Sequence, residues 1–310
     1  MSRLNFQGKG SELFIIGLKN FFLTVVTLGF YSFKAKVVRR QYLWSHMSYD
    51  DQPFSFAGQA MDQVKGLGWV IAMGLGLLAV AAVAFVIHPV LSLPFVYCGI
   101  ALLVIRMKFG GFRYKVRNTT YRKIRGNVAP QAFNLYLKQA IKGAFLTMIT
   151  LGIYRSFNQM HLMKIKWNNA SWGRQAFSFT GDGKEFFWLN LKGVLLCMVT
   201  LGIYTPWYLA NRYRYLASHL HFMNSPFKFE VSGSQFFKLF FITVLGTVFT
   251  LGIATPWLAT MVIRELSASF SYTGNPDWNQ ITEDLRAALK NAGDMGADAL
   301  DFDHDFDFAM

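Results

Sequence analysis

Lysine and arginine side chains recur at a fixed place in this sequence, and they are the residues best suited to bind a charged ligand. Each lies 10 to 12 residues beyond the glycine of a Thr-Leu-Gly phrase. Guanidinium and ammonium groups bind phosphate and carboxylate groups through charge-assisted hydrogen bonds. The pattern therefore predicts an anion-binding or lipid-headgroup site that is repeated along the chain. Its candidate residues are Arg39, Arg40, Lys164, Arg212, Arg214 and Arg264.

A second set of cations surrounds the segment FRYKV at 112–116. Alternation of this kind is typical of a β-strand, in which successive side chains point to opposite faces. The apolar residues then share one face, and Arg113, Lys115 and Arg117 share the other. We add these three cations to the candidate anion site. We expect no nucleic-acid partner, because a basic loop beside a membrane segment is explained by the membrane alone.

Catalytic and metal-binding patterns are missing from the sequence. His219 and His221 are two residues apart, so on a helix they point about 200° from one another and share no metal. Asp50 and Asp51 precede a proline and are expected to be solvated turn residues. The tail segment DALDFDHDFDF (298–308) lacks the glycine and the terminal glutamate of a calcium loop. No Gly-rich phosphate loop, His-Glu-x-x-His or Gly-x-Ser-x-Gly motif occurs. We expect no enzyme activity, no metal and no cofactor.

An internal repeat spaces the cations. The phrase TLGIYTPW at 200–207 returns as TLGIATPW at 250–257, while TLGIY and TLGFY stand at 150–154 and 27–31. A glycine after an apolar run ends a helix in the left-handed conformation, and Thr-Pro is typical of the start of the next helix. The phrase therefore predicts a helix stop joined to a helix start. The breaks fall at Gly29, Gly152, Gly202, Gly252, Pro206 and Pro256.

Composition indicates a membrane protein. The chain has 310 residues, of which 53% are hydrophobic and only 15% charged, which is too apolar for an ordinary soluble protein. The uncharged run at 66–87 is long enough for a membrane crossing, which takes about 20 helical residues, and a second run follows at 90–105. Together they predict a transmembrane hairpin. Cys98 and Cys197 both lie in apolar stretches, so a disulfide framework is not expected.

The predicted fold is a mainly α, polytopic helical membrane protein built from four internal repeats. We place the repeats near 4–58, 127–181, 182–233 and 234–275, within a membrane domain of residues 1–275. A transmembrane hairpin at 66–106 and a basic loop or strand at 107–126 interrupt the series. Each repeat ends in a Phe-x-Phe or Phe-x-Tyr phrase, and we expect these short strands to form a small cytoplasmic sheet. The fourth copy looks shortened, because FSYTG starts at Phe270.

Charge distribution predicts the orientation. Nine of the seventeen acidic residues lie from Asp277 onward, so residues 276–310 are expected to form a short amphipathic helix and a disordered acidic tail. The basic body points to the cytoplasm, where membrane-protein loops collect Lys and Arg. An even number of crossings per repeat keeps all the similar basic segments on that side. We expect the first helix of a repeat to dip into or cross the bilayer, with the basic helix at the inner interface or lining a wet cavity. The sequence leaves six and ten spans in total both open.

The repeated phrases also carry a family resemblance. The segments TLGFYSFKAKVVRRQYLWSHMSYDDQPFSFAG (27–58), TLGIYRSFNQMHLMKIKW (150–167) and TLGIYTPWYLANRYRYLASHLHFMNSPFKF (200–229) resemble the YjgN-like family of bacterial inner-membrane proteins, a domain family of unknown function. The resemblance covers most of residues 4–275. It implies a multi-pass protein of the bacterial plasma membrane and transfers no catalytic residue.

Two function classes remain open. The first is a transporter or channel-like protein, in which the repeated cationic helices surround a path for an anionic solute or lipid. The second is a non-transporting scaffold that binds anionic lipids and cytoplasmic partner proteins. The bilayer and its anionic lipids are the expected partners in both classes, and the sequence does not decide whether the chain forms a homo-oligomer.

Overall fold

One building unit, two antiparallel helices followed by two short strands, repeats around the molecule. The computed structural model describes residues 2–274 and Ile281, so the expected helix near 277–292 and the acidic tail lie outside the described residues. The helical pairs are α1 (Gly10–Val26) with α2 (Ser32–Ser45), α3 (Ala60–Ile87) with α4 (Pro89–Asn118), α5 (Ala132–Ile149) with α6 (Arg155–Asn168), α7 (Gly183–Val199) with α8 (Thr205–Ser218), and α9 (Gly233–Phe249) with α10 (Thr255–Ala268).

The strands form one closed antiparallel barrel in the order β1-β10-β9-β8-β7-β6-β5-β4-β3-β2. They are β1 (Ser2–Phe6), β2 (Met47–Tyr49), β3 (Gln52–Phe56), β4 (Thr119–Tyr121), β5 (Ile124–Val128), β6 (Ala170–Trp172), β7 (Gln175–Phe179), β8 (Leu220–Phe222), β9 (Ser225–Phe229) and β10 (Phe270–Tyr272). Tight two-residue turns with positive φ at both positions join several neighbouring strands, at 50–51, 122–123 and 223–224. Turns of this kind match the twist of antiparallel strands.

The N-terminal strand closes the ring. In four units a β-hairpin follows the helical pair, but after α10 the described residues contain one strand, β10. Its partner is β1 from the other end of the chain, with Ser2 opposite Tyr272 and Arg3 opposite Ser271. β1 also pairs with β2, with Leu4 opposite Tyr49. The first strand of the chain is thus the second strand of the fifth unit.

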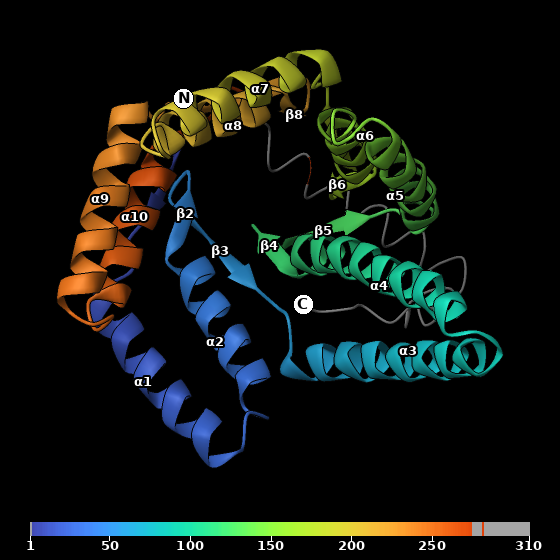
Figure 1. The fold of residues 1–310 in the computed structure, drawn as a ribbon. Coiled ribbons are helices and arrows are strands. Elements are labelled where there is room, and N and C mark those ends of the chain that lie inside the picture. The colour runs from blue at the N-terminus through green and yellow to red at the C-terminus, as the bar shows by residue number, and fades with distance from the viewer. Residues whose placement is uncertain (1, 275–280, 282–310) are drawn as a thin grey trace, which may run out of the picture.

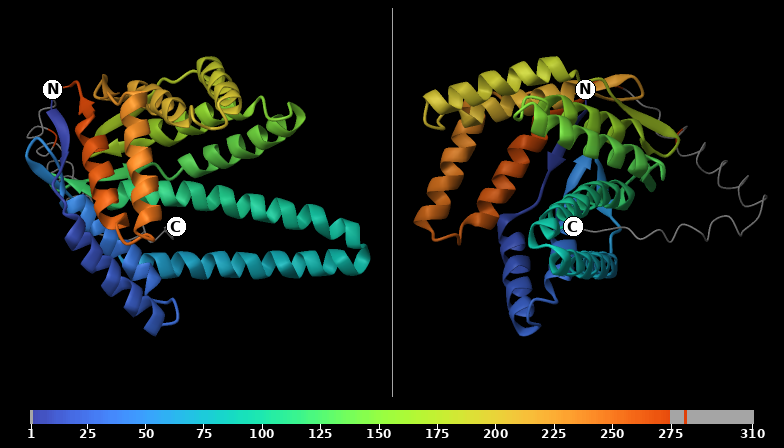
Figure 2. Two further views of the ribbon diagram at one scale, coloured as in Figure 1. Left: turned by 60° about the vertical axis from the view of Figure 1, so that its left-hand side comes forward. Right: turned by 45° about the vertical axis from the view of Figure 1, so that its right-hand side comes forward.

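The five helical hairpins surround the barrel in chain order, like the spokes of a wheel (Figure 1). Each hairpin packs against the next one along the chain, and α10 packs against α1 to complete the circle. Figure 2 shows that the α3–α4 hairpin projects furthest from the strands. The sequence feature that looked like an inserted hairpin is therefore one of five equivalent units, with longer helices than the others.

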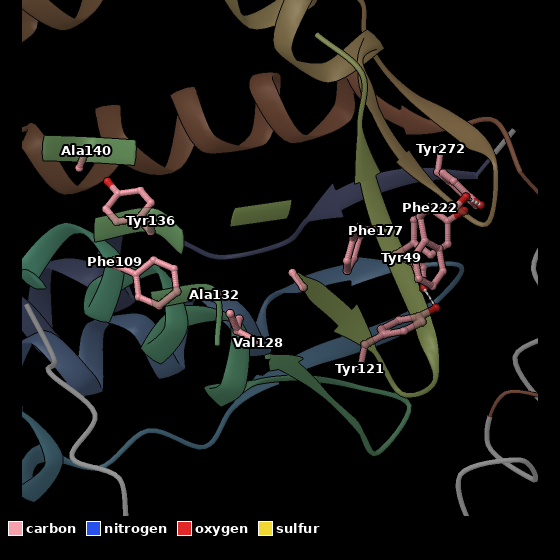
Figure 3. Packing of buried hydrophobic residues seen from close by; sticks show 11 residues of the cluster. Tyr49, Phe109, Tyr121, Val128, Ala132, Tyr136, Ala140, Phe177, Phe222 and Tyr272 are labelled. Atoms are coloured by element: carbon pink, nitrogen blue, oxygen red, sulfur yellow. Dashed lines mark hydrogen bonds between the residues drawn. The ribbon is translucent and has the colours of Figure 1, made fainter. Parts of the chain in front are cut away.

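Register places aromatic side chains inside the ring. The third residue of each short strand faces the third residue of a longer strand from the neighbouring unit, and both point inward. The five facing pairs are Tyr49 with Leu4, Tyr121 with Phe54, Trp172 with Gly126, Phe222 with Phe177, and Tyr272 with Phe227. Figure 3 shows several of these rings turned toward one another. Because side chains alternate along a strand, each unit contributes two residues to the same core.

Gly126 is the exception among the ten inward positions, and α4 fills the space that it leaves. A Cβ atom built on Gly126 would lie 2.5 Å from the carbonyl oxygen of Val116. The absence of a side chain therefore lets the last turns of α4 approach the inside of β5. Phe112 and Val116 of α4 pack against the core as a result.

The predicted fold class was wrong. The described residues form a closed barrel with five helical hairpins, rather than a polytopic helical bundle of four repeats with a small sheet. Within the described residues, one helical segment, Phe95–Asn118, is long and apolar enough to cross a membrane. The apolar helices Ile71–Val86 and Gly233–Phe249 are shorter. Small strands that pair within one hairpin and with the hairpins of neighbouring units leave too weak a local pattern to predict a barrel.

Two local predictions were also wrong. The segment FRYKV lies in the last turns of α4, where Tyr114 is completely buried, because its alternating pattern also places one residue per helical turn on the core. The phrase FSYTG contains the short strand that directly follows a helical pair, unlike FSFAG and FSFTG, which contain the longer second strand of a β-hairpin. The fourth copy looked shortened because the strand that completes it, β1, lies at residues 2–6.

Removal of the Phe6 side chain should open the ring. Phe6 is 1% exposed in the closing strand, and truncation of a buried phenylalanine to alanine costs about 3–5 kcal/mol. We expect Phe6→Ala to lower the thermal unfolding midpoint in detergent strongly. Asn5→Ala, which changes the neighbouring exposed residue of the same strand, is the control. Equal midpoints for the two variants would show that the ring does not depend on β1.

Candidate functional site

The four Thr-Leu-Gly phrases form the outer tips of four helical hairpins, as tight turns without an unpaired backbone N–H. In the first tip, the N–H groups of residues 27–30 and 32 donate to carbonyls inside the turn, and that of Tyr31 donates to the Thr27 hydroxyl. The hydroxyl in turn donates to the Leu23 carbonyl at 2.7 Å. The tips at 150–155, 200–205 and 250–255 have the same bonds. A turn of this kind is suited to lipid, where unpaired backbone groups are costly.

Leucine and glycine give the tips their shape. Leu28, Leu151, Leu201 and Leu251 have φ near +50° and Gly29, Gly152, Gly202 and Gly252 have φ near +90°, so two consecutive residues are left-handed. Pro206 and Pro256 follow as the second residues of α8 and α10. A leucine in the left-handed region is strained, yet these four are 90–94% exposed. The side chains are thus presented outward at a conformational cost.

The first helix of each unit continues this apolar surface toward the ring. Large hydrophobic side chains lie exposed along α1, α5, α7 and α9, including Phe21, Phe145, Val199 and Phe249. Charges are distant from the tips of the last two hairpins, since residues 193–211 and 239–263 contain none. We call these four turns, with their flanking exposed residues, the hairpin tips.

Two of the predicted cations tie neighbouring units together. Arg214 donates to the Val231 carbonyl at 2.8 Å, and Arg264 donates to the Gly8 carbonyl at 3.1 Å. Both carbonyls belong to the loop between a longer strand and the next first helix. Arg113 and Lys164 occupy the same place, six residues before a short strand. The recurrence of a cation at this position thus has a structural account at Arg214 and Arg264.

The remaining predicted cations lie on three different units. Arg212 donates to Gln159 at 3.0 Å and lies 5.4 Å from the centre of the Phe186 ring. Arg40 lies 5.9 Å from the centres of both the Phe56 and Tyr114 rings. The other cations among these are the exposed Arg39 and the half-buried Arg117. These cations are spread over α2, α4 and α8, which belong to different hairpins of the ring (Figure 1), so they do not meet around one path.

The barrel encloses an apolar cavity of about 430 Å³. Its wall is made of inward residues from the short and the longer strands, with contributions from α4 and α6. Two tyrosine hydroxyls in the wall are paired, since Tyr121 donates to the Tyr49 carbonyl at 2.8 Å and Tyr272 donates to the Phe222 carbonyl at 2.6 Å (Figure 3). Burial raises the pKa of both phenols. Lys115 and Thr119 are the polar side chains beside the aromatic and aliphatic ones.

Lys166 lies beside this cavity, although sequence reasoning did not select it. Its Nζ is 5.4 Å from the centre of the Phe112 ring and 5.1 Å from that of Tyr136. Burial, and to a smaller extent the charges of Lys108 and Lys115, lower the pKa of Lys166 to about 8. Three lysines thus converge where α4, α5 and α6 meet. Lys166 follows the predicted cation Lys164 by two residues, and on a helix this spacing places the two side chains on different faces.

Among the described residues, no group of three or more His, Cys, Asp and Glu side chains is placed to hold a metal. His219 Nδ1 lies 2.8 Å from the Tyr215 carbonyl oxygen, and its Nε2 lies 3.9 Å from Glu185. Asp50 and Asp51 form the turn between β2 and β3, and Asp50 pairs with Arg122 of the next turn at 2.9 Å.

The fold defines a class of protein: a ring of five helical hairpins closed by a short-stranded barrel. A family model described as "Bacterial protein of unknown function (DUF898)" matches residues 1–180, 174–245 and 208–299, so the chain belongs to this family. The chain is also 29% identical over 118 residues to inner membrane protein YjgN of Salmonella typhimurium strain LT2. The match spans 38% of this chain and 29% of that relative. Both findings confirm the resemblance that the repeated phrases indicated. No solved structure matches.

The stability of the protein should rise with pH because of Lys166. Its pKa is about 8 in the folded chain and 10.5 ordinarily, so between these values the unfolded chain binds more protons and stability increases with pH. Lys166→Met should remove this increase, which amounts to roughly 3 kcal/mol at most. Free energies of unfolding in detergent at pH 7 and pH 10 measure it. The exposed Lys138→Met is the control, and identical pH dependence of wild type and Lys166→Met would contradict the assignment.

Proposed function

We propose that the protein is an inner-membrane scaffold that inserts its hairpin tips into one leaflet and holds the barrel at the cytoplasmic surface. The observation that carries the proposal is the construction of the tips. Four turns pair all of their N–H groups internally and expose leucines that are strained in the left-handed region. Transfer of such exposed apolar side chains from water into hydrocarbon lowers their free energy. The name of the Salmonella relative supports the same membrane.

Helix lengths set the depth of insertion. Leu201 lies nine residues beyond Lys192 and Leu251 lies thirteen beyond Lys238, which correspond to about 14 and 20 Å of helix. A hydrocarbon core is about 30 Å thick. Tips of this reach enter the core without crossing it, and both ends of each hairpin stay on the same side. No hairpin then makes a complete crossing, so every basic second helix remains on the same face of the membrane.

The basic composition of the ring side favours the cytoplasmic face and anionic lipids. Residues 1–276 contain 29 Lys and Arg against 8 Asp and Glu. Cations near the surface of an anionic leaflet contribute about 1 kcal/mol each, and cytoplasmic segments are enriched in them. The exposed Lys34 and Lys36 of α2 and Arg155 of α6 flank their tips, so these two hairpins are expected to insert less deeply than the last two.

A scaffold is favoured over a transporter because of the interior of the ring. The cavity wall is aromatic and aliphatic apart from Lys115 and Thr119, and an anionic solute that passed through it would lose its hydration without replacement. Arg214 and Arg264 donate to loop carbonyls. Their positive charges therefore contribute to the cohesion of the ring.

The depth of the tips can be measured with an environment-sensitive fluorophore. Leu201→Cys and Leu251→Cys, in a chain without Cys98 and Cys197, are labelled and reconstituted into vesicles that contain lipids spin-labelled on the acyl chain. We expect strong quenching at both positions, because the labels lie in hydrocarbon. Met223→Cys is a matched control, since Met223 is also exposed, apolar and left-handed, but lies in a β-turn of the barrel. Labels at 201 and 251 that are quenched no more than the label at 223 would sink the proposal.

The role of the repeated cations separates a scaffold from a transporter. Loss of the bond to the Gly8 carbonyl should cost Arg264→Gln about 1–3 kcal/mol and leave anion flux into vesicles unchanged. Arg39→Gln, at an exposed residue without a hydrogen bond to the described residues, is the comparison and should change neither quantity. An Arg264→Gln variant with full stability and altered flux would favour transport instead.

A further inference from the structure

The barrel cavity combines an apolar interior with a charged mouth. Lys115 lines the cavity and is also exposed, so it marks a place where the cavity reaches the surface. Phe112, one turn earlier on α4, lines the cavity as well, and the Lys166 ammonium group lies over its ring at 5.4 Å. Lys108 adds a third charge on the same side.

The salt bridges of the described residues do not neutralise these charges. None of Lys108, Lys115 and Lys166 pairs with a carboxylate there. Positive groups held together without counter-charges repel one another. An anion between them would remove this repulsion and gain charge-assisted hydrogen bonds.

We propose that the cavity binds a single-chain anionic amphiphile, with its apolar chain inside the barrel and its charged group held by Lys115 and Lys166. The volume of about 430 Å³ lies within the range of about 300–1,000 Å³ that is typical of ligand sites. The Tyr121 and Tyr272 hydroxyls of the aromatic wall donate to backbone carbonyls, so these two groups are not free to bind a sugar or a nucleotide. The chemistry of the site thus selects a long apolar chain that ends in a carboxylate or a phosphate.

Gly126 contributes to this site by its missing side chain. At that inward position the other units carry leucine or phenylalanine, which would fill the space that α4 enters. The last turn of α4 brings Lys115 into the wall, and Thr119, the first residue of β4, follows it there. Of the described inward positions, the one without a side chain is thus the one beside the charged mouth. The α3–α4 unit thus breaks the fivefold repetition of the ring, because it alone among the described units combines a missing inward side chain with the charged mouth.

One other occupant has the right chemistry, and the experiment tests for it. The C-terminal sequence DFDHDFDF (301–308) alternates acidic and aromatic residues, so it combines an apolar and an anionic character in the same way. A chain that ends at Gly293 lacks this segment and retains every described residue. Comparison of the two chains decides between a lipid-like ligand and the tail of the protein.

Binding is measured by native mass spectrometry on the full-length protein in amphipol, where membrane insertion has no part. The probes are oleate, mono-oleoyl phosphatidic acid and oleyl alcohol, which share one chain and differ in the head group. We expect both anionic probes to bind with one molecule per chain and oleyl alcohol to bind at least about tenfold more weakly. The tighter of the two anionic probes indicates whether a free fatty acid or a single-chain phospholipid is the natural source.

Variants assign the two parts of the site. Lys115→Gln with Lys166→Gln should weaken oleate binding about tenfold or more and leave oleyl alcohol binding unchanged. Lys228→Gln, at an exposed residue of β9, is the charge control and should have no effect. Leu220→Trp places a larger side chain in the cavity wall and should abolish binding of all three probes, with thermal unfolding used to check that this variant folds.

Several results would overturn the proposal. These are equal affinities for oleate and oleyl alcohol, unchanged oleate binding in the double lysine variant, or binding that survives in a folded Leu220→Trp protein. Binding only by the chain that ends at Gly293 would identify the tail as the occupant. Since the fluorophore experiment on the hairpin tips needs no cavity, failure of this proposal leaves the scaffold proposal intact, and the reverse also holds.

Discussion

The pairing of β1 with β10 is the contact on which the rest of the structure depends. Two strands from opposite ends of the chain exchange backbone hydrogen bonds with Ser2 opposite Tyr272, and no covalent link reinforces them. Without this contact, β10 and β2 would be open edges with unpaired backbone groups, which are costly when buried and prone to wrong pairing when exposed. Closure also brings α10 against α1. Closure of the circle of helical hairpins therefore depends on β1, a strand of five residues.

The closed ring stabilises short strands by joining ten of them around one core. Strands of three to five residues are too short to be stable in isolation. Each nevertheless contributes an inward ring to the same core, and the Phe54–Tyr121 and Phe177–Phe222 pairs lie with ring centres 4.8 and 4.9 Å apart. Aromatic pairs at such distances stabilise beyond their buried area. Phe109 and Tyr136 of the helices also belong to this core, whereas the exposed apolar side chains of α1, α5, α7 and α9 are left to the lipid in our proposal.

The sequence was sufficient to predict the repeated Thr-Leu-Gly helix breaks, but not the closed barrel. The 50-residue return of the Thr-Leu-Gly phrase is a local signal, and it located the helix breaks that the structure places at Gly152, Gly202 and Gly252. Pairing of Leu4 with Tyr49 or of Ser2 with Tyr272 is set by packing between distant segments, which leaves no periodic trace. The unit at 60–128 was taken for an insertion because it has no Thr-Leu-Gly phrase. Its equivalence with the others emerges from the order of its helices and strands.

The candidate site was visible only in part for a similar reason. Arg214 and Arg264 stand out in the sequence by their spacing, yet they donate to loop carbonyls, which any cation at that place could do. Lys115 was selected for the wrong reason, as part of a strand. Lys166 and Gly126 were not selected, because their roles arise from contacts with residues elsewhere in the chain: Phe112 and Tyr136 for Lys166, and Val116 for Gly126. Positions whose meaning depends on a close approach need the fold before they can be read.

A ring that is closed by its first and last strands has a consequence for how the chain is made. The ribosome releases β10 about 270 residues after β1, so β1 waits through the production of all five hairpins. Long-range pairing of this kind is slow to form. Early insertion of the hairpins into the bilayer would hold the growing chain in an open arc and bring its two ends together in a plane. Since the seam is not covalent, a circularly permuted gene that begins at another β-turn should yield the same ring.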